Sequence, residues 1–188
     1  MKKNEKFCHI RQNRTVEVFS LLLVVLLLST FTSAARAGTS TLTAQASVAT
    51  NCTVSTASLM FGIYDPIGTH SSVNLTASGS IQIQCIKNTA PTIGISLGNN
   101  ATSSTRRMLS GTNNYLLYEI YKPLNATADA ACSFSSAVVW GAAGANQLSP
   151  TASLSTNSRN YNVCGSVPAG QDPAIGNYSD TVVVTVTF

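Results

Sequence analysis

Short runs of alternating apolar and polar residues recur along this chain of 188 residues. Residues 80–86 and 92–97 have this character, residues 137–140 (AVVW) form a short apolar run, and residues 178–188 (YSDTVVVTVTF) show the strongest strand pattern. A period of two puts alternate side chains on opposite faces of an extended strand, so these runs predict half-buried β-strands. About seven such strands with frequent turn residues, and no sustained helical period, predict an all-β sandwich. The last strand would present one apolar face, made by Val182, Val184, Val186 and Phe188.

The same alternation appears earlier, in residues 39–49 (TSTLTAQASVA). The apolar positions are mostly small and would share one face of an extended strand. They are Leu42, Ala44, Ala46 and Val48. From the alternation alone, this segment fits either the first strand of its own sheet or an arm that completes the fold of another copy. No residues before Cys52 favour a tight hairpin turn.

Residues 1–37 have the organisation of a signal peptide. A basic beginning precedes an apolar run at residues 18–28, and small residues follow at Ala35 and Ala37. This pattern predicts export with cleavage after Ala37, or alternatively after Ala35. An uncleaved membrane anchor is the competing interpretation, but the apolar run is short for a span of about 20 residues.

Removal of this leader leaves a mature chain with five basic and five acidic residues, because six of the eleven basic and two of the seven acidic residues precede position 38. A net charge near zero gives no electrostatic basis for binding nucleic acid. Arg106 and Arg107 fall in a polar stretch at residues 103–107, which predicts an exposed loop with both side chains solvated.

Four cysteines remain after export: Cys52, Cys85, Cys132 and Cys164. An even number in an exported protein predicts two disulfides, and three pairings are open from the sequence. The chain lacks a Cys-x-x-Cys motif, and His70 is the only histidine of the mature part, so we expect no metal site.

The sequence contains no pattern that predicts catalysis. His70 lies in a polar loop, the acidic residues are single and scattered, and neither a phosphate-binding loop nor a dinucleotide fingerprint is present. We therefore expect that the protein is not an enzyme and needs no cofactor.

Four stretches together resemble a known family. They follow the leader and the alternating arm in the order 51–54 (NCTV), 79–85 (GSIQIQC), 115–121 (YLLYEIY) and 176–188 (GNYSDTVVVTVTF). The chain resembles the spore coat protein U domain family, which includes subunits of archaic (Csu-type) chaperone–usher pili. The final stretch, ending at Phe188, carries the most specific part of this resemblance. Its penultimate residue is Thr187, whereas better-known pilins have an aromatic residue at that position.

The resemblance implies an immunoglobulin-like, pilin-type sandwich at residues 51–188 that lacks its last strand, preceded by a donor-strand arm at residues 38–50. Leu42, Ala44, Ala46 and Val48 would be the donor residues, and the face at Val182, Val184, Val186 and Phe188 would border the acceptor groove. Cys52 would pair with Cys85, which leaves Cys132 for Cys164.

The implied function is that of a structural subunit in a surface fibre that supports adhesion and biofilm formation. The implied partners are other pilin subunits, a periplasmic chaperone and an outer-membrane usher, and the chain would pass through the periplasm to the cell surface. The alternative is a secreted, self-contained immunoglobulin-like binding or coat protein.

Overall fold

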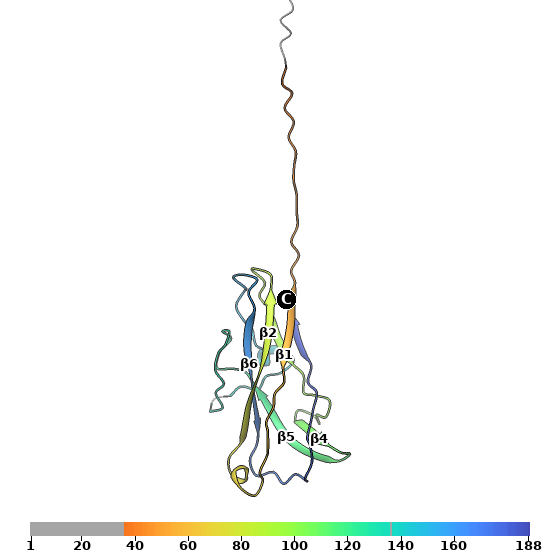
Figure 1. Cartoon of the computed structure of the whole chain (residues 1–188), viewed down its shortest axis with the longest axis vertical. Coiled ribbons are helices and arrows are strands. Elements are labelled where there is room, and N and C mark those ends of the chain that lie inside the picture. Colours follow the sequence, from red (N-terminus) through yellow and green to blue (C-terminus); the bar gives the residue numbers. More distant parts are fainter. Residues whose placement is uncertain (1–35, 136) are drawn as a thin grey trace, which may run out of the picture. The chain divides into compact units, whose positions relative to one another are not determined.

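The computed structural model describes residues 36–135 and 137–188. The predicted signal peptide, residues 1–37, therefore lies outside the described residues except for its last two positions. The chain divides into two units, Met1–Ala46 and Ser47–Phe188. Residues 36–51 contain no helix or strand, and every side chain in this segment is exposed (Figure 1).

The Ser47–Phe188 unit is built from antiparallel strands in two sheets. The larger sheet has the spatial order β1-β2-β6-β5-β4, and the smaller sheet pairs β3 with β7 (Figure 1). The strands are β1 (Cys52–Ala57), β2 (Leu75–Cys85), β3 (Thr92–Ile95), β4 (Arg106–Ser110), β5 (Asn114–Tyr121), β6 (Arg159–Val167) and β7 (Val184–Thr187). The described helical segments are two single turns, η1 (Thr69–Ser71) and η2 (Gly144–Asn146). The predicted all-β class is confirmed.

Several boundaries differ from those that the alternation predicts. The strand predicted at residues 80–86 is the second half of the longer β2. Only the end of the 178–188 run forms β7. Residues 137–140 contribute an isolated bridge between Val139 and Tyr121. The prediction of an exposed loop at residues 103–107 is wrong, because Arg106 begins β4 and is fully buried.

The core lies between the two sheets and follows from the alternation. In β2, Ile81 and Ile83 are fully buried while Gln82 and Gln84, which alternate with them, are exposed. Ile93 and Ile95 of β3 belong to the same apolar cluster, so side chains from both sheets form one core. Trp140 is also fully buried, and its indole N–H donates to the carbonyl of Ile93 at 2.8 Å.

A buried arginine links the two sheets. Arg106 projects from β4, forms an ion pair with Glu119, and donates to the carbonyls of Ser96 at 2.8 Å and Trp140 at 2.7 Å. A buried guanidinium is tolerated only when its donors and its charge are paired. The strand register provides this pairing, since Arg106 lies opposite Tyr118, the residue before Glu119.

Two disulfides fasten the sandwich. Cys52 is bonded to Cys85, directly opposite it in the β1–β2 ladder, and Cys132 is bonded to Cys164 in β6. The bridged residues are 33 and 32 positions apart. A loop of that length gives each bridge a stabilisation of about 3 to 4 kcal/mol in the chain-entropy account.

Candidate functional site

One edge of the C-terminal strand is open. In β3, the N–H groups of Ile93 and Ile95 donate to Leu148 and Gly141, on the side of β3 away from β7. Ile93 and Ile95 are the register partners of Val186 and Val184, so these pairs are of the non-hydrogen-bonded kind. The backbone N–H and C=O groups of Val184 and Val186 therefore point to the other side of β7, where no described residue pairs with them.

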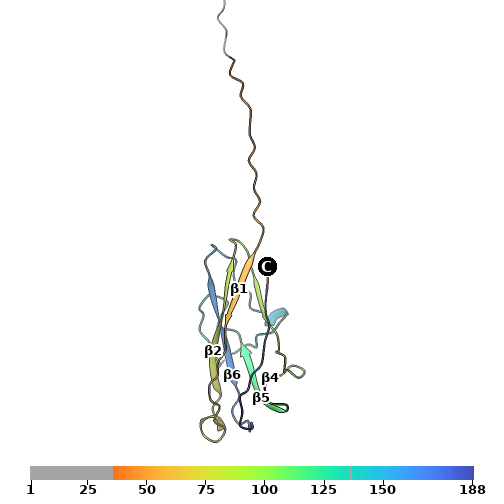
Figure 2. The ribbon, with the colours of Figure 1, turned by 45° about the vertical axis from the view of Figure 1, so that its right-hand side comes forward.

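The outer edge of β1 is open for the same reason. Ile86 donates its N–H to the carbonyl of Asn51, which sets the hydrogen-bonded positions of the β1–β2 ladder at Asn51 and every second residue after it. The backbone groups of Cys52, Val54 and Thr56 consequently point away from β2. Figure 1 shows the violet β7 next to β1, while Figure 2 turns the unit by 45°. The space along the two open edges is called the groove below.

Other strand edges in the described part of the chain are covered. Residues 141 and 148 cover β3, and Ser179 exchanges both backbone hydrogen bonds with Leu109 of β4. Where β6 ends, the side-chain amide of Gln171 bonds to both the N–H and the C=O of Leu117 in β5, at 2.8 and 3.1 Å. Covered edges protect a sheet from indiscriminate pairing, so the open pair at β1 and β7 stands out.

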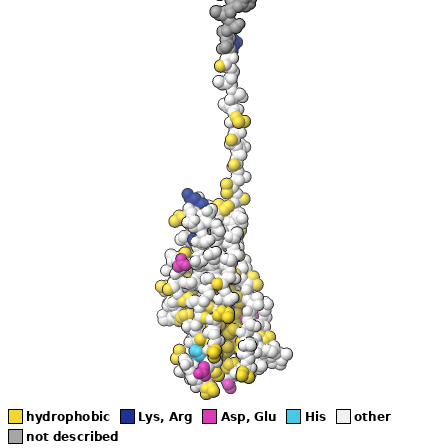
Figure 3. Space-filling model, viewed as in Figure 1, with side chains coloured by type: hydrophobic (Ala, Val, Ile, Leu, Met, Phe, Trp, Pro, Cys, Tyr) yellow, Lys and Arg dark blue, Asp and Glu magenta, His cyan; other side chains and the backbone are white. Residues whose placement is uncertain are grey.

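An apolar cleft lies at the end of the sandwich away from Cys52. Its volume is about 820 Å³, and its walls are residues 59–67 and 173–178. Leu75, Met108, Leu116 and Val167 line it from the larger sheet. Figure 3 shows apolar side chains gathered over the lower part of this unit. Met60 and Ile175 at the rim are 78% and 103% exposed.

A glycine makes room for one wall of the cleft. A Cβ at Gly165 in β6 would lie 2.6 Å from Leu59 and 2.7 Å from Phe61, so only glycine lets these side chains approach β6. Phe61 also meets Tyr118 edge to face, with ring centroids 6.1 Å apart. The wall is thus held by the larger sheet although β1 ends at Ala57.

A carboxylate fixes the segment that leads into β7. Asp180 accepts hydrogen bonds from the Tyr118 hydroxyl at 2.8 Å and from the backbone and side-chain nitrogens of Asn100 at 3.1 and 3.0 Å. Burial and the hydrogen bond to Asp180 raise the pKa of Tyr118 well above its ordinary value of 10.0, so the hydroxyl stays a donor. These bonds hold the final segment against β5 and the 96–100 turn.

The Spore Coat Protein U domain family profile matches residues 38–185, which is most of the chain. The chain belongs to this family. A similar relative is Protein U of Myxococcus xanthus, which is 32% identical over 139 residues, covering 69% of this chain and 71% of the relative.

Among solved structures, this chain is similar to one chain in the crystal structure of the CsuC–CsuE chaperone–tip adhesion subunit pre-assembly complex from the archaic chaperone–usher Csu pili of Acinetobacter baumannii. The sequence identity is 24% and the TM-score is 0.48. The match covers 75% of this chain and 40% of the matched chain in that complex. This likeness is too distant to carry a functional argument.

In this spore coat protein U domain, the residues predicted for the acceptor face lie in β7 or within two residues of it. Val182, Val184 and Val186 are partly buried against the core, and Phe188 is 51% exposed. All four predicted donor residues are exposed: Leu42, Ala44, Ala46 and Val48.

The sequence interpretation did not single out the residues that line the cleft. Leu59 and Phe61 are partly buried on either side of the exposed Met60, and this local alternation is a signal that identifies them as inward-facing. Tyr178 is the first residue of the predicted strand at residues 178–188. Met108 and Leu116 become neighbours only through the β4–β5 register, which the sequence does not reveal.

His70 has structural partners in the spore coat protein U fold. Its ring stacks on Tyr64 with centroids 5.2 Å apart, and Nδ1 lies 2.9 Å from the carbonyl oxygen of Val73. Within residues 36–135 and 137–188, no group of three His, Cys, Asp or Glu side chains is arranged to hold a metal ion. None of the helices in those same ranges is long and apolar enough to cross a membrane.

Proposed function

We propose that this chain is a structural subunit of a surface fibre, in which residues 38–50 of one copy fill the groove between β1 and β7 of the next. The observation that supports this function is the pair of open edges, together with an apolar cleft, in a fold whose other described edges are covered. An added strand satisfies such edges with ladder hydrogen bonds and uses alternate side chains for fit.

The arm has the length and pattern that the groove requires. Residues 178–188 would span about 33 Å if extended at 3.3 Å per residue, and residues 39–49 span the same number of steps. Burial of Leu42 and Val48 would contribute about 3 to 6 kcal/mol, and each ladder hydrogen bond about 1 kcal/mol net. A head-to-tail contact that does not close on itself produces a filament.

The open groove also accounts for the proposed partners. An unpaired apolar edge aggregates unless it is covered, so a periplasmic chaperone would cover β7 until the arm of another subunit replaces it. An outer-membrane usher would then pass the growing fibre to the cell surface, where it supports adhesion and biofilm formation. In this role the chain has no catalytic activity and no cofactor.

Deletion of residues 39–49 tests the proposal. The variant should reach the periplasm and bind its chaperone, yet electron microscopy of the cell surface should show no fibres of this subunit. Fibres made by the deletion variant would contradict the proposal.

The alternative, a self-contained secreted binding or coat protein, makes a different prediction for the full-length chain. It would be a stable monomer without a chaperone, and hydrogen exchange would find the amides of Val184 and Val186 protected in that monomer.

A further inference from the structure

The sandwich presents different charge at its two ends. The first end, called here the Cys52 end, contains the start of β1 and the end of β7, together with Lys87, Leu154 and Phe188. Hydrogen bonds from Asn88 to Ser153 and from Ser153 to Thr89 bring the 151–155 loop to this end. Lys87 is exposed there, and Leu154 is 88% exposed.

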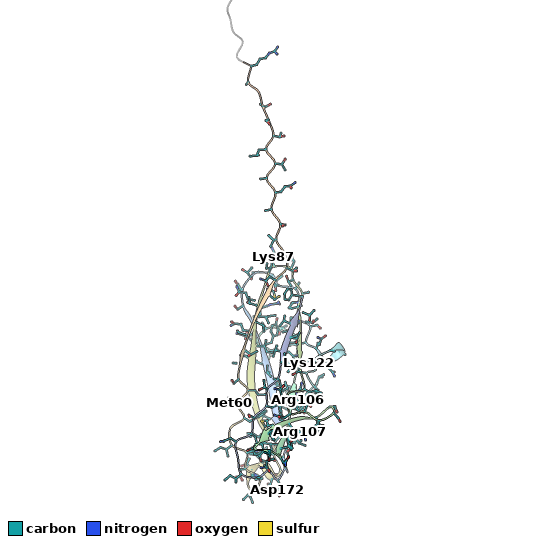
Figure 4. All side chains as sticks on the ribbon, turned by 90° about the vertical axis from the view of Figure 1, so that its right-hand side faces the viewer. Met60, Lys87, Arg106, Arg107, Lys122 and Asp172 are labelled. Atoms are coloured by element: carbon teal, nitrogen blue, oxygen red, sulfur yellow. A yellow bond between two sulfur atoms is a disulfide. The ribbon has the colours of Figure 1, made fainter. Side chains whose placement is uncertain are left out.

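The opposite end, called here the cleft end, is apolar and acidic. Ile63 and Ile67 are 87% and 93% exposed, and Asp65 lies between them. His70 joins two loops at this end, because its N–H donates to Asp65 and its carbonyl accepts from Gly170, two residues before Asp172. Figure 4 shows Lys87 and Asp172 at opposite ends of the unit.

The balance of charge at the Cys52 end includes both signs. Arg159, in the strand position opposite Ile83, adds a positive charge, although its guanidinium is bonded to Thr151 and Ser153. Asp129, whose N–H donates to the carbonyl of Asn160, offsets part of this charge. Lys87 is therefore the exposed cation that an acidic surface would meet first.

The short connection between arm and sandwich restricts how two copies can lie. Only residues 49–51 separate Val48 from Cys52. These four steps span at most about 14 Å when fully extended. In the proposed fibre, the Cys52 end of the donating copy must therefore lie close to the point where its arm leaves the groove.

The direction in which the arm runs decides at which end of the accepting copy it leaves the groove. A strand antiparallel to β7 continues the antiparallel β3–β7 sheet, and its last residue, Val48, leaves at the cleft end. The opposite direction would bring two Cys52 ends together, an arrangement of like surfaces that closes as a dimer. A growing fibre therefore requires the first arrangement.

We propose that the cleft end of each subunit docks directly on the Cys52 end of the copy whose arm it holds, as a second interface beside the groove. This inference rests on the proposed function. Asp65 and Asp172 face Lys87 across the contact, and Ile63 and Ile67 pack near Leu154. Complementary charge of this kind fixes orientation more than it adds affinity. The contact makes the fibre stiffer than sandwiches joined by free hinges.

Disulfide cross-linking of fibres tests this contact. In the full-length chain, Leu154→Cys combined with Ile67→Cys should give a ladder of covalent multimers under mild oxidation, visible on a non-reducing denaturing gel. The two single variants, assembled together, should give cross-linked dimers and nothing longer. The matched control is Arg107→Cys combined with Ile67→Cys, because Arg107 lies in β4 away from the Cys52 end (Figure 4).

Charge reversal provides the second measurement. Lys87→Asp should slow formation of the ladder at low ionic strength, Asp172→Lys in the same chain should restore it, and high salt should remove the difference. The proposed docking contact would be overturned if the Leu154–Ile67 pair cross-linked no faster than the Arg107 control pair. It would also be overturned if charge reversal left the rate of ladder formation unchanged. The proposed function fails separately, if deletion of residues 39–49 leaves fibres intact.

Discussion

Polymerisation should depend on the apolar face of the arm. In the free chain Leu42 is 97% and Val48 is 81% exposed, so nearly all of their surface is available for burial. Replacing both with serine removes about 1.5 to 3 kcal/mol of transfer free energy for each side chain. The total of about 3 to 6 kcal/mol corresponds to a loss of about 100- to 10,000-fold in the affinity of one subunit for the next.

The measurement is the fraction of chain in polymers, separated by sedimentation over a range of chain concentrations. The matched control is Thr43→Ser with Gln45→Ser, which changes the opposite face of the same strand and should leave the curve nearly unchanged. Equal assembly by the apolar-face variant and the wild type, or equal loss in the control, would refute the alternation argument.

Three further predictions concern the sandwich itself. Tyr118→Phe should cost about 1 to 2 kcal/mol in denaturant unfolding, since its acceptor carboxylate loses a donor; because folding raises the Tyr118 pKa above 10.0, wild-type stability should be complete below pH 10, fall above it, and fall less in the variant. Arg106→Met should cost about 3 to 5 kcal/mol by leaving its carboxylate partner unpaired, whereas Arg107→Met, at a partly buried site with no carboxylate partner among the described residues, should cost about 1 kcal/mol. Replacing Cys132 and Cys164 by serine should cost about 3 to 4 kcal/mol, read as a lower midpoint in calorimetry, while reduction should then lower the midpoint further through the remaining bridge.

Alternation was a good guide where one strand face meets the core. Residues 80–85 show this, since Ile81 and Ile83 are buried and Gln82 and Gln84 are exposed. The pattern was a poorer guide at strand ends, because alternation reports an extended backbone and not whether a partner strand lies alongside. Residues 178–183 belong to the predicted strand, yet an isolated bridge between Ser179 and Leu109 and scattered bonds hold them in place of a continuous ladder.

Arg106 shows what local sequence cannot provide. An arginine in a polar stretch is usually solvated, and nothing near position 106 indicates otherwise. Its burial depends on Glu119, 13 residues later, and on carbonyls of Ser96 and Trp140, which the fold brings together. The cleft has the same origin, because its lining comes from segments that are distant in the chain. The last strand, in contrast, was visible in part from its own alternation, and the role of residues 39–49 as a donor-strand arm stays a prediction.

The Cys52–Cys85 bridge has a mechanical consequence for a fibre built in this way. Tension along the fibre would enter each subunit at Cys52, the first residue of a six-residue edge strand. If force were applied at the end of such a strand, its hydrogen bonds to the neighbouring strand would break one after another. The disulfide instead transfers the force to β2, which is paired with β1 on one side and β6 on the other. The hydrogen bonds between β1 and β2 are therefore protected from sequential breaking. The tensile limit of the joint would then be set by the seated arm and not by the body that receives it.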